Sequence, residues 1–148
     1  MLHDAGKLIH LYNNTMKNTY INLPIRNVAD TDAFFAALGM TKNEQFSSSD
    51  TTNAKINENT YIMLLEDERF KTFVDGNPEP INNNVTIAIQ FDLREEVDAF
   101  FEKAITSGAT DTTKPSPESE AFMYGKAFRD INGHIWELFA FIGAMPKA

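Results

Sequence analysis

Alternating apolar and polar residues predict the strands of this chain. Successive side chains on a β-strand point to opposite faces, so a period of two marks a strand with one buried face. Four stretches show this pattern clearly: 19–25, 60–65, 85–91 and 135–142. A weaker pattern at 44–58 predicts two short strands around a turn near Ser49 and Asp50.

Two stretches instead space their apolar residues as a helix does. Residues 94–107 have apolar side chains at positions i, i+3, i+4 and i+7, and Gly108 is expected to end this helix. A shorter helix is expected to begin with Asp30 as its N-cap and to end at Gly39. The chain therefore mixes strands and helices, which is typical of an α+β fold.

The middle of the chain predicts a helix followed by a linker. Residues 66–74 look helical and carry Phe70 and Phe73, and residues 75–84 are rich in Gly, Pro and Asn. The two phenylalanines either form a flap over a cavity or fill space beneath a connecting loop.

The segment 122–141 predicts a closing β-hairpin. Asn132-Gly133 is a strong signal for a tight turn, because both residues tolerate positive φ. In the strand that follows, Glu137 is the one carboxylate among apolar residues. Burial of an ionised carboxylate is costly unless it is paired or binds a metal, so Glu137 is a candidate functional residue.

The two halves of the chain repeat one order of elements. Each has a strand, a helix and then further strands, and Asp32-Ala33-Phe34-Phe35 recurs as Asp98-Ala99-Phe100-Phe101. Both motifs fall in the helix that follows an alternating strand, with a glycine a few residues later. The pattern predicts a duplicated βαβββ unit, at about 18–66 and 84–143, with one apolar sheet face covered by each helix.

Composition narrows the class of protein. The 148 residues are 43% hydrophobic, which suits one globular domain, and the net charge of −8 argues against nucleic acid or an anionic membrane as a partner. Cysteine is absent, which excludes disulfides, thiol catalysis and thiolate metal sites and fits the cytoplasm. Residues 1–17 fit neither unit and are expected to be a peripheral N-terminal extension.

Four segments, in order, resemble the vicinal oxygen chelate superfamily of glyoxalases, bleomycin-resistance proteins and extradiol dioxygenases. The segments are Ile21–Ile25, Asp32–Gly39, Tyr61–Leu65 and Phe128–Leu138, and the resemblance covers about residues 19–141. In the last segment the family's usual Asp-Pro-Asp-Gly-His turn is altered, with Ile131-Asn132 in place of Pro-Asp. The resemblance implies two βαβββ units that form a curved mixed sheet with a cleft and helices on the outer face.

The family usually holds a divalent metal in this cleft. Carried over by strand position, its ligand positions fall at Tyr20, Met63, Thr86 and Glu137. Of these, only Glu137 is a ligand that Zn, Ni, Mn or Fe(II) usually takes. The resemblance therefore implies a cleft without the usual metal site, and no cofactor is predicted.

Strand alternation then separates two faces. The face expected to meet the helices is apolar: Ile21, Leu23, Ile25, Ile62, Leu64, Val85, Ile87, Ile89, Trp136 and Leu138. The face expected to line the cleft is amphipathic, as ligand pockets usually are. Its candidate ligand-binding residues are Tyr20, Asn22, Tyr61, Met63, Thr86, Gln90, Phe139 and, on the penultimate strand, Tyr124. Leu65, Ala88 and Phe128 are expected beside them.

Glu137 has more than one interpretation. It is either a structural residue that accepts hydrogen bonds, a contact to a cationic or hydroxylated ligand, or a general base whose pKa is raised by burial.

Three functions remain open. The favoured one is a metal-independent binding protein of the bleomycin-resistance type, a cytoplasmic homodimer that sequesters or carries an aromatic or amphipathic small molecule. The alternative is a glyoxalase I-like lyase or extradiol dioxygenase-like enzyme with a non-standard divalent metal site or Glu137 as general base. The third is an interaction domain whose cleft is filled by its own side chains.

Overall fold

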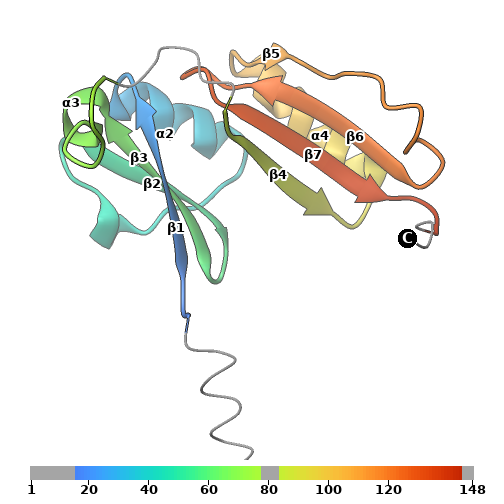
Figure 1. Ribbon diagram of the computed structural model, residues 1–148, viewed down its shortest axis with the longest axis horizontal. Coiled ribbons are helices and arrows are strands. Elements are labelled where there is room, and N and C mark those ends of the chain that lie inside the picture. The colour runs from blue at the N-terminus through green and yellow to red at the C-terminus, as the bar shows by residue number, and fades with distance from the viewer. Residues whose placement is uncertain (1–15, 78–83, 145–148) are drawn as a thin grey trace, which may run out of the picture.

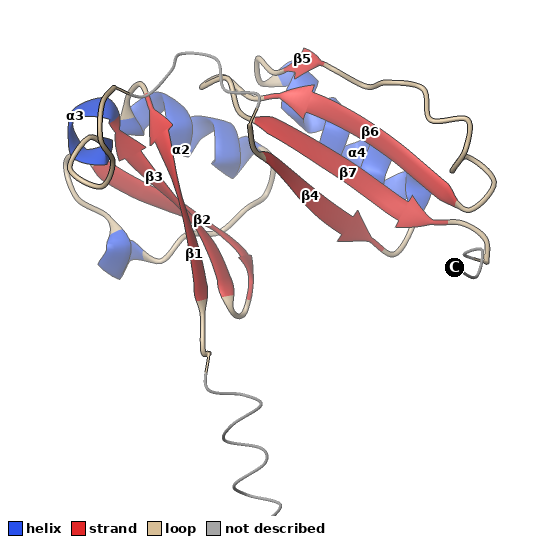
Figure 2. Ribbon diagram, in the orientation of Figure 1, coloured by secondary structure: helices blue, strands red, loops and turns tan. Residues whose placement is uncertain are grey.

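The computed structural model describes residues 16–77 and 84–144 (Figure 1). Helices and strands follow one another in the order shown in Figure 2. Their bounds are β1 Thr19–Ile25, α2 Val28–Ala37, 3₁₀-helix η1 Glu44–Phe46, β2 Thr51–Asn57, β3 Thr60–Glu66, α3 Asp67–Phe70, β4 Thr86–Phe91, α4 Arg94–Thr106, β5 Thr110–Asp111, β6 Met123–Arg129 and β7 Ile135–Phe141. The expected extension lies outside the described residues except for Met16 and Lys17, and the linker 75–84 is described only in part.

The strands form two sheets that lie side by side, with α2 and α4 behind them in Figure 1. The first module has strand order β1-β3-β2, and the second has β4-β7-β6-β5. In each sheet the first strand is parallel to the last, and the last is antiparallel to its other neighbour. The α+β class and the two βαβββ-like modules predicted from the sequence are therefore confirmed.

The aspartate of the duplicated Asp-Ala-Phe-Phe motif makes equivalent contacts in both modules. Asp32 on α2 accepts a hydrogen bond from Thr52 Oγ1 on β2 at 2.5 Å and pairs with Lys42 at 3.0 Å. Asp98 on α4 accepts a hydrogen bond from Tyr124 Oη on β6 at 2.5 Å and pairs with Lys126 at 3.4 Å. Since β2 and β6 hold the same place in their sheets, each aspartate ties its helix to the same strand, and this equivalence supports duplication.

The first module departs from the expected pattern between α2 and β2, where a further strand was predicted. The weak strand predicted before Ser49 is absent, and η1 occupies part of its length. Lys55 N donates to Thr41 O at 2.8 Å, but the Asn53 side chain takes over the next bonds, to Asn43 N at 2.9 Å and Asn43 O at 2.8 Å. An amide side chain thus satisfies the backbone that a strand would have paired, and the chain leaves the sheet edge.

Two predicted helices also differ at their ends. Asn27, not Asp30, caps α2, because Asn27 Oδ1 accepts from Asp30 N at 2.8 Å and leaves Asp30 in the first turn. The helix predicted for residues 66–74 is a single turn, α3, followed by turns. Within the described ranges, no helix has the length and apolar character needed to span a membrane.

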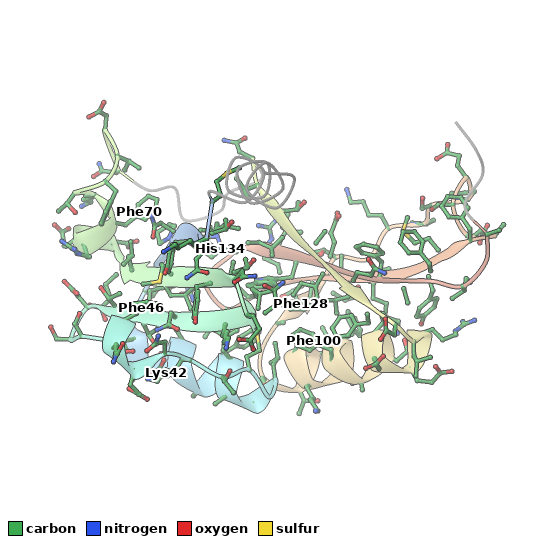
Figure 3. All side chains as sticks on the ribbon, turned by 90° about the horizontal axis from the view of Figure 1, so that it is seen from below. Lys42, Phe46, Phe70, Phe100, Phe128 and His134 are labelled. Atoms are coloured by element: carbon green, nitrogen blue, oxygen red, sulfur yellow. The ribbon has the colours of Figure 1, made fainter. Side chains whose placement is uncertain are left out.

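The apolar faces predicted for the strands meet the helices as expected. Trp136 and Phe128 are fully buried and stack at 6.3 Å, and Phe35 of α2 contacts the Trp136 ring at 5.6 Å. Figure 3 shows Phe128 and Phe100 between the second sheet and α4. Val85 is the exception among the predicted positions, because it precedes β4 and is 47% exposed. The core therefore runs through both modules.

The closing turn docks the second module onto the first. Asn132 Oδ1 accepts from Arg26 N at 2.9 Å, and Asn132 Nδ2 donates to Thr31 Oγ1 at 3.1 Å. His134 lies where the modules meet in Figure 3, with Nε2 2.6 Å from Pro24 O. His134 thus connects the closing turn to the end of β1.

The turn itself is not the tight two-residue hairpin that Asn132-Gly133 predicted. Residues 130–134 connect the strands, and only Gly133 has positive φ, at 94°. Asp130 organises this longer turn: one carboxylate oxygen accepts from Asn132 N and His134 N, and the other accepts from Trp136 Nε1 at 2.8 Å.

Candidate functional site

Each sheet has a distal face, which we define as the face turned away from α2 or α4. On the first distal face, aromatic rings of the protein itself gather over the strands. The Phe46 ring of η1 makes edge contacts with Tyr20 at 5.7 Å and with Tyr61 at 5.5 Å, and the two tyrosines stack on each other at 5.6 Å. Phe46 therefore lies across the strands that were expected to line the cleft.

Burial confirms that this face is largely covered. Tyr61 is 9% exposed, Leu65 is 3% exposed, and Asn53 is held beneath the segment that contains η1. The short helix α3 packs against β1 and β3, and Figure 3 shows Phe70 on the side away from α2. Tyr20 remains 45% exposed at the strand edge. The protein's own side chains thus cover this face over β2 and β3, whereas Tyr20 and Asn22 of β1 stay exposed.

The second distal face is open. Glu137 lies on β7, the strand between β4 and β6, and its carboxylate side chain is exposed. Its neighbours across the sheet are Ala88 on β4 and Ala127 on β6. Because both neighbours are small, they leave the carboxylate accessible rather than shielding it.

An apolar surface continues from this carboxylate along β7. Phe139 is the next residue on the same face, flanked by Gln90 and Gly125, and its ring meets Phe141 edge-on at 5.5 Å. An exposed carboxylate, an exposed amide and half-buried aromatic rings therefore share one strand and its neighbours. This surface matches the amphipathic character predicted for the cleft.

Glu137 differs from its expected environment in one respect. The sequence suggested a buried carboxylate, but Glu137 is exposed because the residues beside it are alanines and its face carries no helix. Glu137 therefore lacks the buried environment on which the general-base interpretation rested.

The four positions at which the family resemblance placed metal ligands form equivalent pairs. Tyr20 and Thr86 occupy matching places on β1 and β4, and Met63 and Glu137 occupy matching places on β3 and β7. Tyr, Met and Thr are poor ligands for Zn, Ni, Mn or Fe(II). Among residues 16–77 and 84–144, no three His, Asp or Glu side chains are grouped closely enough to hold a metal ion. The residues present thus do not fit such a metal.

Tyr124 lies on the opposite side of its sheet from the predicted position. Its hydroxyl donates to Asp98 on α4, and the Arg94 guanidinium lies 4.4 Å from the centre of its ring. The reason is register: Tyr124 shares the helix side of β6 with the buried Phe128, which was expected near the cleft too. Both residues belong to the layer between sheet and helix.

The hydrogen bond to Asp98 and burial together raise the pKa of Tyr124 above its ordinary value of 10.0. A raised pKa in the folded state stabilises the fold at pH below that ordinary value, and the contribution is lost as pH rises through the folded pKa. We expect Asp98→Asn to lower the pKa of Tyr124. Absorbance titration of the phenolate checks this, with Tyr124→Phe assigning the signal. An unchanged titration would contradict the assignment.

Two features of this site were not predicted from the sequence. Phe46 was not singled out, because nothing in the local pattern shows that the segment predicted as a weak strand before Ser49 instead folds over the sheet. Ala127 was not singled out either, whereas Ala88 was expected on the face that Glu137 occupies and lies opposite it.

Solved structures share this fold. A hypothetical protein from S. aureus matches with a TM-score of 0.74 at 24% identity, over 88% of this chain and 98% of that chain. A glyoxalase/bleomycin resistance protein/dioxygenase family enzyme from Burkholderia phytofirmans PsJN matches with a TM-score of 0.69 at 17% identity, over 83% and 97%. The fosfomycin resistance protein FosX from Listeria monocytogenes matches with a TM-score of 0.60 at 22% identity, over 87% and 92%.

These matches define the fold class. The chain has the fold of the glyoxalase/bleomycin resistance/dioxygenase proteins, the vicinal oxygen chelate fold that the sequence motifs resembled. No protein-family model matches the sequence, and neither does any curated protein. Because one fold serves many activities, the function rests on the side chains of the site.

Proposed function

We propose that this protein binds a small aromatic or amphipathic cation on its second distal face, without a metal. The observation that carries the proposal is the exposed carboxylate of Glu137 between Ala88 and Ala127, continuous with the apolar surface at Phe139. The carboxylate is the charge partner for a cation, and the small and aromatic residues accept a flat apolar body.

The covered first distal face supports this location. Phe46 and the stacked tyrosines occupy the equivalent surface of the first module, which leaves less room for a ligand there. The exposed edge of Tyr20 is still available as a side wall. The proposed ligand therefore lies mainly on β4, β6 and β7, with Gln90 as a neutral hydrogen-bonding group.

Metal independence follows from the same side chains. Glu137 is the only favourable metal ligand at the four family positions, and one carboxylate does not hold a divalent ion against water. The proposed role is thus sequestration or transport of the ligand rather than metal-assisted chemistry.

Paired compounds test the proposal directly. Flat aromatic compounds that carry either a quaternary ammonium group or an isosteric neutral tert-butyl group are titrated calorimetrically in EDTA. We expect the cationic members to bind more tightly through charge attraction, and Glu137→Gln to weaken them by up to about fivefold while leaving the neutral members unchanged. The exposed position of Glu137 predicts an unaltered fold in this variant.

Glu102→Gln is the matched control, because Glu102 is exposed on α4, the element covering the other side of the same sheet. It removes the same charge and should leave cation binding unchanged. Equal affinity for both compound series, or tight stoichiometric Zn, Ni, Mn or Fe(II) that is lost in Glu137→Ala, contradicts the proposal.

A further inference from the structure

A hollow of about 470 Å³ lies where the two modules meet, away from both distal faces. The first module contributes the start of α2, and the second contributes the end of α4 and the closing turn. Its volume falls in the range of small-molecule pockets, about 300 to 1,000 Å³. None of its lining residues belongs to the surface proposed above for cation binding.

Two opposite charges line this hollow without pairing. Arg26 is exposed, and within the described part of the chain its guanidinium forms no ion pair. Asp30 also faces solvent, and one of its carboxylate oxygens accepts a single bond from Asn27 Nδ2 at 2.9 Å. Each charge therefore retains hydrogen-bonding capacity for a ligand.

The fold fixes the backbone at both charged residues. The backbone N–H of Arg26 donates to the buried Asn132 side chain at 2.9 Å, which fixes the point where the arginine side chain begins. Asp30 sits in the first turn of α2, where its own N–H is bound to Asn27 Oδ1. Only the side chains must be ordered when a ligand binds, which reduces the entropic cost.

Apolar side chains form part of the inner surface of the hollow. Phe34 and Ala33 of α2 form one wall, and Ile131 of the closing turn forms another. Ile131 packs closely over Gly108 after α4, where an added Cβ would lie 3.2 Å from Ile131 Cγ2. Ser107 adds a hydroxyl at the rim. A ligand of this site thus needs an apolar part as well as charge.

The N-terminus of α2 is not by itself an anion-binding site, because N–H groups of its first turn already have partners. Val28 N already donates to Glu66 Oε2 at 3.0 Å, and Asp30 N is capped. An anion alone would be attracted by Arg26 but repelled by Asp30. A cation alone would be attracted by Asp30 but repelled by Arg26. A molecule carrying both charges satisfies both groups.

From this arrangement we propose that the hollow binds an apolar α-amino acid. Its carboxylate pairs with Arg26, its ammonium pairs with Asp30, and its side chain packs against Ala33, Phe34 and Ile131. Because the ligand contacts both modules, it stabilises their docked arrangement through binding linkage. This site is separate from the proposed cation site and does not depend on it.

L-leucine is the probe, with leucinamide, which lacks the carboxylate, and 4-methylpentanoate, which lacks the ammonium. We expect leucine to bind in calorimetry and to shift amide NMR signals of residues 26–34, Ser107 and residues 131–132. Each analogue should bind at least about tenfold more weakly, since it leaves one charge unpaired. Arg26→Gln and Asp30→Asn should cause a similar loss, and Ala33→Leu should block binding by filling the hollow.

Lys71→Gln removes the same charge as Arg26→Gln but lies after α3, among residues that do not line the hollow, and should bind leucine normally. No leucine binding by the wild-type protein overturns the proposal, as do equal binding by Arg26→Gln or signal shifts confined to residues 86–90 and 135–141. Since the cation titration reports on Glu137, failure of either proposal leaves the other standing.

Discussion

Replacement of Asp130 by alanine is expected to lower the free energy of unfolding by about 3 kcal/mol or more. The buried carboxylate accepts hydrogen bonds from Asn132 N, His134 N and Trp136 Nε1, and alanine leaves all three donors without their acceptor. Each buried donor left unsatisfied costs about 1–3 kcal/mol. Urea unfolding followed by Trp136 fluorescence, the only tryptophan, measures the loss.

Two further variants make this result specific. Asp130→Asn keeps one acceptor oxygen and should lose less stability than Asp130→Ala. Asp75→Ala, in an exposed loop, should leave the unfolding midpoint unchanged. If Asp130→Ala and Asp75→Ala unfold at the same urea concentration, the carboxylate does not organise the turn.

Replacement of Phe128 by alanine is expected to cost about 3–5 kcal/mol, the usual cost of deleting a fully buried aromatic side chain. The ring is 0% exposed and contacts Trp136 and Phe100 within its own module and Phe34 of the first module at 6.3 Å. The cavity would therefore weaken both the second core and the contact between modules. Chemical denaturation with tryptophan fluorescence and circular dichroism detects both effects.

Phe141→Ala is the matched control, because Phe141 is a strand phenylalanine that is 38% exposed on the second distal face. Phe141→Ala should lower the free energy of unfolding much less than Phe128→Ala does. Coincident unfolding curves from the two probes are expected for Phe128→Ala if the modules unfold together. A loss no larger than that of Phe141→Ala contradicts the packing described for Phe128.

Strand positions were predictable from sequence because burial on one face enforces the period of two. The predicted strand 19–25 agrees with β1 to the residue, and the Asp-Ala-Phe-Phe repeat correctly identified the two equivalent helices. The same pattern placed Glu137 on the face away from α4. Local alternation was sufficient there because β7 is flanked by strands on both sides.

Two of the failures have a common cause, which is that side chains replaced or redirected backbone contacts, and the third has its cause in strand register. Asn53 satisfies Asn43 and so removes the predicted strand before Ser49. Asp130 gathers the donors of a longer turn where Asn132-Gly133 alone predicted a tight one. Tyr124 was placed near the cleft without a register for β6, and only the pairing of β6 with β7 shows its true side.

Binding residues are harder to predict than strands because access depends on distant segments. No pattern around Tyr20 and Tyr61 indicates that Phe46 lies over them. The expectation that the protein forms a homodimer stays a prediction, and so does the choice among ligand classes that the amphipathic strands allowed.

The contrast between the two distal faces bears on how this protein can evolve. Residues such as Ala88, Gln90 and Glu137 are exposed, so substitutions there cost little folding stability. Such substitutions seldom lower the free energy of unfolding below the threshold that the protein needs to stay folded and functional. Phe46, Asn53 and Tyr61 are tied into packing and hydrogen bonds, so their replacement is penalised. The first distal face is thus the more constrained of the two, and the second is freer to acquire new ligand preferences.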